Sequence, residues 1–525
     1  MKKKYLYVCF VDLQKAFDSV NRKALIHKLK RCVDTGPFFN IIKDMYSDVR
    51  FSIKLECGAT SAFSTSAGVK QGCSLSPTLF SLYVNDLVNE FDDNCQPAVL
   101  GEKNISCLLY ADDLVLISES PSGLQASLNK LDKYCEYWNL QINIKKTNIM
   151  IFNKSGKMIH KEKFCIGNKS IAIAPEYKYL GLLFKPSGTF SHAVHNLTNK
   201  AKKAMFSLRS TLENDRLMVL PKLKLFDSCI KPIALYCTEV WIMDVIKISK
   251  GGIEKRFNSI TPEKMHIKYL KNMLEVNRGA VNSAVLSELG RYPLYISCLK
   301  LMIGFWIHII NSSANSLINI SYHANKLIKN GFCQQLEKFL KDIGFHHVWN
   351  NQNTFSKRRL MKSVDNKLQE NYVRHWKRTL DENSEVYCSK LRTYKDLKHT
   401  YDLEKYLLLD VDKLHIKNFL KIRISNSKLM IEWGRYKHLE TDKRLCPLCQ
   451  IDVETEFHFI MCCPCFKKER ETLFQNIYNV VPTFKDKNEF EQFEYLLQYN
   501  EYDIAKICVS SISNMYNERL SRLGP

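Results

Sequence analysis

The chain has 525 residues, of which 45% are hydrophobic, enough for two to four domains with packed cores. Lysine and arginine (77) outnumber aspartate and glutamate (54), which gives a formal net charge of +23. This excess favours a polyanionic partner such as nucleic acid; a generic basic protein, kept soluble by its charge, is the alternative. No membrane partner is expected, because the most apolar segment, Cys298 to Ile310, is too short to span a bilayer.

The N-terminus and the cysteines indicate an intracellular protein, in the nucleus, the cytoplasm or both. Three lysines precede a short apolar run, Tyr5 to Val11, which lacks a small-residue cleavage site. We therefore expect a strand there and no signal peptide. The 19 cysteines are scattered through apolar segments, as is typical of free thiols in a reducing compartment.

Two apolar segments that we expect to be strands carry carboxylates. The first, from Tyr5, ends at Asp12, and the second, Cys107 to Ser118, is interrupted by Asp112 and Asp113. Adjacent anions beside apolar runs need a neutralising charge, and Mg²⁺ is usually held by a few carboxylates together with substrate phosphates. Two such ions about 4 Å apart support phosphoryl transfer. For the Asp112-Asp113 pair alone, an ordinary hairpin turn is the alternative.

Five segments, in this order, resemble the palm motifs of reverse transcriptases of non-long-terminal-repeat (LINE-type) retrotransposons. They are Phe10 to Val20 (FVDLQKAFDSV), Gly68 to Phe80 (GVKQGCSLSPTLF), Tyr110 to Asp113 (YADD), Leu140 to Met150 (LQINIKKTNIM) and Tyr179 to Leu182 (YLGL). One such motif is weak evidence, but five in the order of the family make a chance resemblance very improbable.

The resemblance implies that Asp12 and Asp112 are ligands of two Mg²⁺ ions, with Asp113 as a neighbouring third carboxylate. It also places Phe17 beneath the sugar of the incoming nucleotide. An aromatic ring at that place would clash with a 2′-hydroxyl, the group that distinguishes RNA precursors from DNA precursors. Without the motif, Phe17 is a core aromatic that precedes a helix expected to start at Ser19.

Three further residues gain roles from the resemblance. Gln71 and Gly72 would border the nucleotide and the template, because glycine allows close approach of the backbone and glutamine both donates and accepts hydrogen bonds. The alternative is a simple loop before a helix capped by Ser76. Lys146 corresponds to the lysine near the leaving pyrophosphate; Lys145, and a solvated surface position for both, remain alternatives.

The resemblance implies an RNA-directed DNA polymerase whose partners are an RNA template, a DNA primer or target DNA, and dNTPs. In this family a fingers region precedes the first palm motif, yet only eleven residues precede Asp12. We therefore expect a chain truncated before that motif, inactive if the missing fingers are needed to clamp the triphosphate. A catalytically dead nucleic-acid-binding remnant is the alternative, and a group II intron maturase is a weaker third interpretation.

The expected fold is an α/β palm with a mixed sheet, followed by largely helical regions. We expect a hairpin at 51–68, helices at 21–30, 77–91 and 124–138, and strands at 142–152, 163–173 and 177–184. The expected domains are the palm (1–190), thumb and post-thumb helices (191–300), a basic helical extension (301–440), a zinc knuckle (441–470) and C-terminal helices (471–525). Arg278-Gly-Ala and Ser287 to Pro293 also resemble the post-thumb region of these elements, without an assigned mechanism.

A second constellation lies near the C-terminus. Cys446, Cys449, His458 and Cys463 have the spacing C-x2-C-x8-H-x4-C, which can complete a tetrahedral structural Zn²⁺ site. The segment resembles the C-terminal zinc knuckle of LINE-type proteins. Cys462 and Cys465 leave the fourth ligand open, and unmetallated buried thiols are the alternative to a metal site. If metallated, this small module would help to grip nucleic acid.

Overall fold

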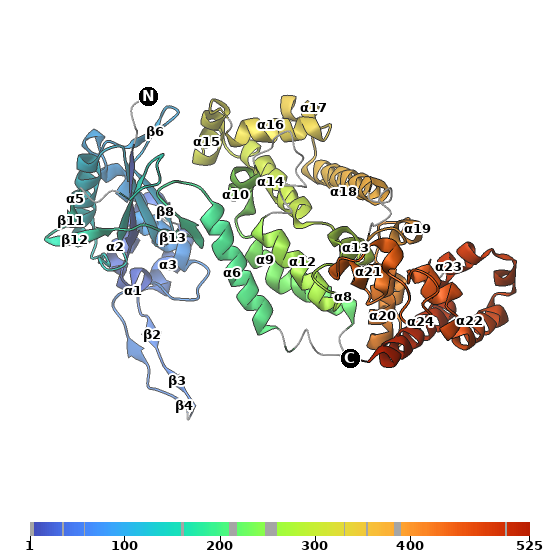
Figure 1. Ribbon diagram of the computed structural model, residues 1–525. Helices are drawn as coiled ribbons and strands as arrows, with labels where there is room; N and C mark the ends of the chain where they lie inside the picture. Colours follow the sequence, from blue (N-terminus) through green and yellow to red (C-terminus); the bar gives the residue numbers. More distant parts are fainter. Residues whose placement is uncertain are drawn as a thin grey trace. The chain divides into compact units, whose positions relative to one another are not determined.

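The computed structural model describes residues 5–33, 36–56, 58–158, 162–208, 210, 218–246, 260–329, 331–352, 355–382, 390–498 and 501–524. The chain forms two compact units. The first comprises residues 1–193 and 312–334, and the second comprises residues 194–311 and 335–525. The strands lie in the first unit, drawn in blue to teal, whereas the second unit is helical (Figure 1).

A mixed sheet of six strands is the centre of the first unit, in the order β11-β12-β10-β1-β9-β8. Only the pair β10 and β12 is parallel. The predicted mixed sheet is thus confirmed. The strands are β1 (Leu6–Asp12), β8 (Cys107–Tyr110), β9 (Asp113–Ser118), β10 (Asn148–Phe152), β11 (Phe164–Ile166) and β12 (Lys169–Ile173).

Strand β1 is apolar on both faces because both faces are covered. Tyr7, Cys9 and Val11 belong to the larger core, which also contains residues of helices α2 (Arg22–Cys32), α4 (Ser76–Val84) and α5 (Pro121–Tyr137). Val8 and Phe10 belong to a smaller core beneath Tyr177 and Tyr179. Alternate residues therefore point into two separate cores, which explains a continuous apolar run that ends at Asp12.

Helices α2 and α5 match the helices expected at 21–30 and 124–138. The helix expected at 77–91 is shorter, because α4 ends at Val84 and the 3-10 helix η1 (Asn85–Glu90) continues the chain. The predicted cap at Ser76 is wrong. Leu75 occupies the N-cap position, and the Ser76 hydroxyl instead donates to the carbonyl of Lys70 at 2.5 Å.

The three strands expected at 142–152, 163–173 and 177–184 are each interrupted or preceded by a turn that the sequence analysis did not place. The strand expected at 142–152 begins only at Asn148, because the backbone N–H groups of Lys146 and Thr147 donate to Asn143 in a turn. The segments 163–173 and 177–184 are hairpins; the second pairs β13 (Tyr177–Tyr179) with β14 (Leu182–Phe184). The hairpin expected at 51–68 is present, with β2 (Arg50–Phe51) paired to β5 (Phe63–Ser64) and β3 (Lys54–Leu55) paired to β4 (Gly58–Ala59) (Figure 1).

The second unit consists of helices packed around apolar stripes. The N-terminal residues of α6 belong to the first unit, which also holds α15 (Leu317–Lys326). The larger helices are α6 (Ser191–Ser207), α8 (Val219–Leu225), α10 (Thr238–Ile246), α12 (Thr261–Met273), α13 (Asn282–Glu288), α14 (Leu294–Ile310), α16 (Phe332–Asp342), α18 (Lys357–Glu382), α20 (Lys413–Arg423), α21 (Met430–Tyr436), α22 (Lys467–Val480), α23 (Glu489–Gln498) and α24 (Tyr502–Leu523).

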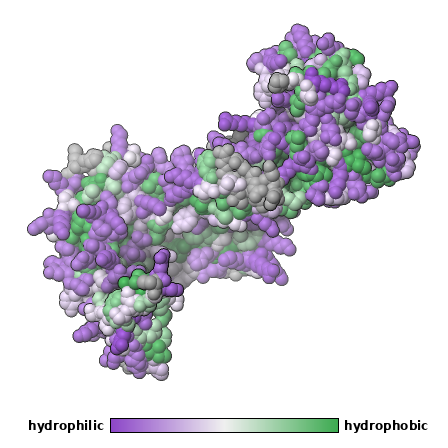
Figure 2. All heavy atoms as spheres, turned by 90° about the horizontal axis from the view of Figure 1, so that it is seen from below, coloured by the Kyte–Doolittle hydropathy of each residue, from purple (hydrophilic) through white to green (hydrophobic). Residues whose placement is uncertain are grey.

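Among the residues that the structure describes, no helix has both the length and the apolar character needed to cross a membrane. The segment Cys298 to Ile310, the most apolar of the sequence, lies in α14, where Cys298, Met302 and Trp306 are buried in the helical unit. Its hydrophobicity is therefore that of a core helix. Hydrophilic residues cover most of the face drawn in Figure 2.

Candidate active site and candidate metal centre

The central sheet brings the three predicted carboxylates together. Asp12, the last residue of β1, lies opposite Asp113, the first residue of β9, in the antiparallel register of these two strands. Asp112 lies beside them in the turn between β8 and β9, where Ala111 has a left-handed backbone with φ of 52°. The tight turn thus presents two adjacent carboxylates at the end of the strand that carries Asp12.

The charges of this cluster are not balanced by the cations that the structure describes around it. Burial, followed by the negative charges of Asp112 and Asp12, raises the pKa of Asp113. Among the described residues, Lys146 is the cation in contact with the cluster: its Nζ lies 4.0 Å from Asp12 Oδ2, and its side chain is 70% exposed. At that distance and exposure its Coulomb attraction is weak. Carboxylate oxygens with excess negative charge are the donor set that a hard divalent cation prefers.

The backbone of Asp12 is fixed by the segment that carries Lys146. The N–H of Asp12 donates to the hydroxyl of the buried Thr147 at 3.2 Å, and the N–H of Asn143 donates to the carbonyl of Asp12 at 2.8 Å. Sequence reasoning missed Thr147, although it directly follows Lys146 within the fourth motif. The turn that shortens β10 is therefore the element that couples this motif to the carboxylates.

The hairpin of β13 and β14 contributes two tyrosines near the carboxylates. Burial raises the pKa of Tyr177, and the charges of Asp12 and Asp113 add to this effect. Burial and Asp113 act in the same way on Tyr179. The ring of Tyr177 also stacks on Phe10 of β1, with ring centroids 4.4 Å apart. The fifth motif therefore forms part of the wall beside the carboxylates, and Tyr177, just before it, was not predicted.

Phe17 lies in the short helix α1 (Ala16–Ser19), so the helix expected to start at Ser19 is wrong. Its half-buried ring packs against Phe80 of α4 with centroids 5.1 Å apart. Residues of the second motif form hydrogen bonds with α1, the helix that carries Phe17. Gln71 Nε2 donates to Asp18 Oδ1 at 2.8 Å, the Val69 N–H donates to the Phe17 carbonyl at 2.8 Å, and Gly72 has φ of 84°.

Arg22, which the sequence did not mark, holds the loop before Gln71. Its Nε donates to the carbonyl of Gly68 at 2.9 Å and its Nη2 donates to that of Ala67 at 2.8 Å. Gly68 has φ of 90°, and a Cβ there would lie 3.0 Å from the carbonyl oxygen of Asp18. The glycine is therefore required by both its backbone conformation and the close approach of the first motif.

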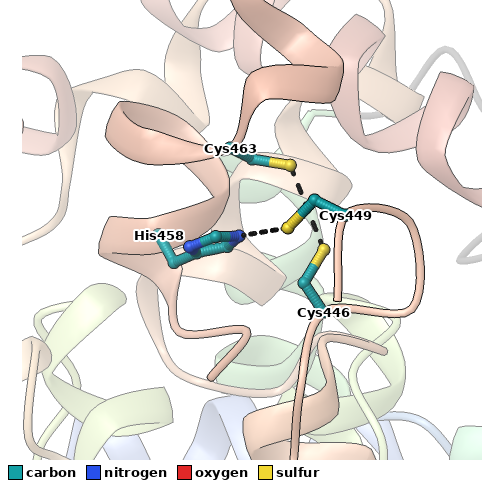
Figure 3. A group of neighbouring side chains, drawn as sticks. All are labelled: Cys446, Cys449, His458 and Cys463. Atoms are coloured by element: carbon teal, nitrogen blue, oxygen red, sulfur yellow. Dashed lines mark hydrogen bonds between the residues drawn. The ribbon is translucent and has the colours of Figure 1, made fainter. Parts of the chain in front are cut away.

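The second constellation also comes together (Figure 3). One ligand atom each of Cys446, Cys449, His458 and Cys463 lies within 4.8 Å of all the others. The sulfurs of Cys446 and Cys463 are 4.0 Å apart, and Cys449 Sγ is 3.3 Å from His458 Nε2. With metal-ligand bonds of about 2.0–2.3 Å, a tetrahedral Zn²⁺ site needs its ligand atoms at about this mutual distance.

The local backbone explains how these four residues meet. The N–H of Cys446 donates to Asp452, and Gln450 has φ of 55° in the turn after Cys449. His458 and Cys463 come from a single π-helical turn, η6 (His458–Cys462), and the residue that follows it. Burial lowers the pKa of His458, which favours the neutral ring that binds a metal.

Of the three candidate cysteines Cys462, Cys463 and Cys465, the structure brings Cys463 into the cluster with Cys446, Cys449 and His458. Among the described residues, the cluster contains neither Cys462, which is exposed, nor Cys465. Cys463 is buried because its N–H donates to the carbonyl of His458, which turns its side chain toward the other three. The sequence spacing pointed to Cys463 but left Cys462 and Cys465 as alternatives.

The N-terminal part of the chain is similar to known proteins. Residues 1–184 match the family described as reverse transcriptase (RNA-dependent DNA polymerase). The RNA-directed DNA polymerase from mobile element jockey of Drosophila funebris is 28% identical over 249 residues, 46% of this chain and 26% of that protein. A Pol polyprotein from retrotransposable element R2 of Nasonia vitripennis is 30% identical over 197 residues, 36% of this chain and 19% of that protein.

The probable RNA-directed DNA polymerase from transposon BS of Drosophila melanogaster is 29% identical over 253 residues, 46% of this chain and 27% of that protein. The chain thus spans about a quarter of the length of the curated relatives it matches. The alignment with a solved structure of telomerase from Candida tropicalis covers 62% of this chain and 50% of the telomerase chain, at 14% sequence identity. Its TM-score of 0.28 is too low to support an argument. The family match over residues 1–184 and the similarity to these relatives confirm the predicted resemblance to reverse transcriptases of the LINE type.

Proposed function

We propose that this chain is an RNA-directed DNA polymerase, which adds dNTPs to a primer 3′-hydroxyl along an RNA template. The observation that carries this proposal is the convergence of Asp12, Asp112 and Asp113 at one end of the sheet, inside a domain of the reverse transcriptase family. Basic composition supports a nucleic-acid substrate, since the formal net charge is +23.

In this proposal Asp12 and Asp112 hold two Mg²⁺ ions, and Asp113 adds a third negative charge beside them. When bound, Mg²⁺ activates the attacking primer oxygen and stabilises the charge on the leaving pyrophosphate. Burial, followed by the charges of Asp112 and Asp12, raises the pKa of Asp113, and a bound cation would offset both effects. The hydrogen bond from Asp12 to Thr147 would keep the first carboxylate in position as substrates exchange.

Four other residues would position the nucleotide. Phe17, braced against Phe80, would lie under the sugar and reject a 2′-hydroxyl. Gln71 and Gly72 would border the base pair, with Gln71 held by Asp18. Lys146 would approach the pyrophosphate; its Nζ, 4.0 Å from Asp12, favours it over Lys145 for this role.

The second proposed metal site is structural. Cys446, Cys449, His458 and Cys463 would bind one Zn²⁺ and leave no open position for a substrate, which is the arrangement of a folding site. The surrounding helices would then serve as a nucleic-acid grip beyond the polymerase domain. In that organisation residues 191–300 act as thumb and post-thumb, 301–440 as a basic extension, 441–470 as the knuckle and 471–525 as its C-terminal support.

Primer extension tests the proposed polymerase. A labelled DNA primer on an RNA template, with dNTPs and Mg²⁺, should be extended by the full chain. Asp112→Asn should reduce extension more than about 100-fold, because it removes one metal-ligand charge from a preorganised site. Asp93→Asn, at the exposed first residue of the 3-10 helix η2 (Asp93–Cys95) in the same unit, makes the same chemical change and should extend normally. A folded chain that binds the primer-template without extending it would overturn the proposal.

A further inference from the structure

A cavity of about 440 Å³ lies in the second unit, away from both sites described above. This volume is in the range of pockets that hold small organic groups. Its wall includes Arg278 and Gly279, which belong to the Arg278-Gly-Ala segment that the sequence analysis left without a mechanism. The other walls are the loop between α20 and α21, residues 425–428, and the helix α21.

Hydrogen bonds between distant segments fix this wall in place. The backbone N–H of Asn277 donates to Asn426 Oδ1 at 2.8 Å, which joins the Arg278 segment to the loop after α20. The N–H of Lys428 donates to the hydroxyl of the buried Tyr516 at 2.7 Å, and Lys390 Nζ donates to the carbonyl of Gly279 at 2.8 Å. The cavity is therefore preformed and does not depend on side-chain rearrangement.

The rim of the cavity is cationic. Arg278, Lys390 and Lys428 line it, and Arg278 and Lys428 are exposed. Neither of these two side chains forms an ion pair with a carboxylate among the described residues. Lys421 lies close to the rim: burial and the charge of Lys417 lower its pKa, Glu275 opposes this effect, and the charge of Lys428 adds to it. Cations without counter-ions attract phosphates.

Two aromatic rings share the same rim. Trp433 and Tyr436, at i and i+3 on α21, line the cavity with 44% and 58% of their surface exposed. Their ring centroids are 6.1 Å apart and the rings are tilted by 52°. Exposed rings beside cations form the platform on which unpaired bases stack, whereas a ring with only a core role would be buried.

Two buried oxygen atoms in the wall lack hydrogen-bond partners within the described part of the chain, although the other oxygen of Glu432 accepts from Arg392 at 2.7 Å. Ser425 Oγ and Glu432 Oε2 line the cavity, are buried, and have no hydrogen-bond partner among the described residues. Ser425 is 1% and Glu432 is 3% exposed. Buried polar atoms without partners are costly, and both of these can accept an N–H. Glu432 is paired with Arg392, and its free oxygen can accept a hydrogen bond but not donate one to a phosphate oxygen. A base with an amino group therefore fits this end of the cavity, and the phosphate fits the end with Arg278 and Lys428.

We propose that this cavity binds one nucleotide of a single-stranded nucleic acid, with the base on Trp433 and Tyr436 and its phosphates at Arg278 and Lys428. The site would hold a strand of RNA or DNA outside the polymerase domain. This inference goes beyond the proposed polymerase activity, because none of these residues belongs to the reverse transcriptase domain of residues 1–184.

Equilibrium binding to the full chain tests this inference. Labelled 12-nucleotide strands of RNA and of DNA with one sequence, and the DNA duplex of that sequence, are titrated by fluorescence anisotropy. Trp433→Ala should raise the Kd for single strands about 10-fold through lost stacking, and Trp433→Phe should restore most of the affinity. Tyr502→Ala removes an equally exposed ring, 53% accessible, outside the cavity and should change the Kd less than 2-fold.

Two further readouts locate the strand. Quenching of tryptophan fluorescence by the single strand should be weaker in Trp433→Phe although binding is retained. The double variant Arg278→Gln/Lys428→Gln should reduce the slope of log K against log salt by about 1.4, at about 0.7 for each phosphate contact. Lys468→Gln/Lys485→Gln removes the same charge from exposed positions outside the cavity and should leave the slope nearly unchanged.

The outcomes separate this proposal from the polymerase. Binding of the single-stranded RNA or DNA more tightly than the duplex supports the site, and the strand that binds more tightly is the one that the site prefers. Equal affinity and equal quenching in Trp433→Ala and the unchanged protein would overturn it, as would preference for the duplex. Circular dichroism of each variant ensures that a loss is not unfolding. All of these measurements are independent of primer extension, so each proposal can fail while the other stands.

Discussion

Replacing Arg519 by methionine should strongly destabilise the unit that contains the cysteine-histidine cluster. Arg519 of α24 donates to both carboxylate oxygens of Glu454, at 2.5 and 2.6 Å, and both side chains are at most 2% exposed. Glu454 also accepts from the N–H of Met430 at 2.6 Å, and its Oε1 lies 3.7 Å from Cys446 Sγ. Methionine would fill the space of the arginine stem but leave a buried carboxylate without its counter-charge.

The magnitude follows from this burial. Removing one partner of a buried ion pair costs about 3–5 kcal/mol, because the other charge is left uncompensated. In a unit of roughly 300 residues each kcal/mol lowers the midpoint by about 1.5 °C, so the expected drop is roughly 5–8 °C. The double variant Arg519→Met/Glu454→Gln removes the orphaned charge and should recover about half of the loss, since neutral pairs of similar shape are tolerated.

Scanning calorimetry of the zinc-loaded full chain measures the midpoint, and a colorimetric chelator measures the rate of zinc release. We expect faster release from Arg519→Met, because Glu454 would lie beside Cys446 without the guanidinium. Arg522→Met is the matched control on the same helix, where the ion pair with Glu518 is about 40% exposed and worth little. Equal midpoints for Arg519→Met and Arg522→Met would refute this reasoning.

Two further changes test the two units separately. Lys28→Met should lower the stability of the reverse transcriptase domain by about 1–3 kcal/mol, measured by denaturant titration. The substitution removes the hydrogen bond from Lys28 Nζ to the 42% exposed Asp86 and the contact of Nζ with the Trp138 ring, whose centroid is 3.5 Å away. An unchanged unfolding midpoint would contradict a stabilising role for Lys28. Cys463→Ser should abolish stoichiometric zinc in elemental analysis while Cys465→Ser retains it, and the reverse result would assign the fourth ligand to Cys465.

The strands and the site could be predicted from the sequence wherever an apolar pattern and a motif coincide. The run from Tyr5 to Val11 predicted β1, and the break at Asp112 and Asp113 predicted the hairpin of β8 and β9. The hairpin at Tyr177 to Phe184 was read as one strand, although Gly181, with φ of 82°, is a turn signal that could have revealed it. The residue before it, Leu180, has φ of 45°, which its side chain does not predict.

Buried charges were beyond sequence reasoning, because lysine and arginine are assumed to be exposed. Arg423 is buried against Glu288, a residue 135 positions away, and Lys28 is buried against Tyr83 and Asp86. No local pattern connects such partners. The same holds for Thr147 beneath Asp12, since the contact depends on a turn that the strand prediction overlooked.

The polymerase proposal requires the carboxylates at the end of β1 and in the turn before β9 to hold divalent metal ions. Replacing Mg²⁺ by Fe²⁺, with ascorbate and peroxide, generates hydroxyl radicals that cut the backbone beside the bound ion. We predict fragments that end near Asp12 and near Asp112, suppressed by excess Mg²⁺ and absent in Asp112→Asn but present in Asp93→Asn. Cleavage elsewhere, or cleavage at these places that Asp112→Asn does not change, would contradict the metal site and the polymerase mechanism built on it.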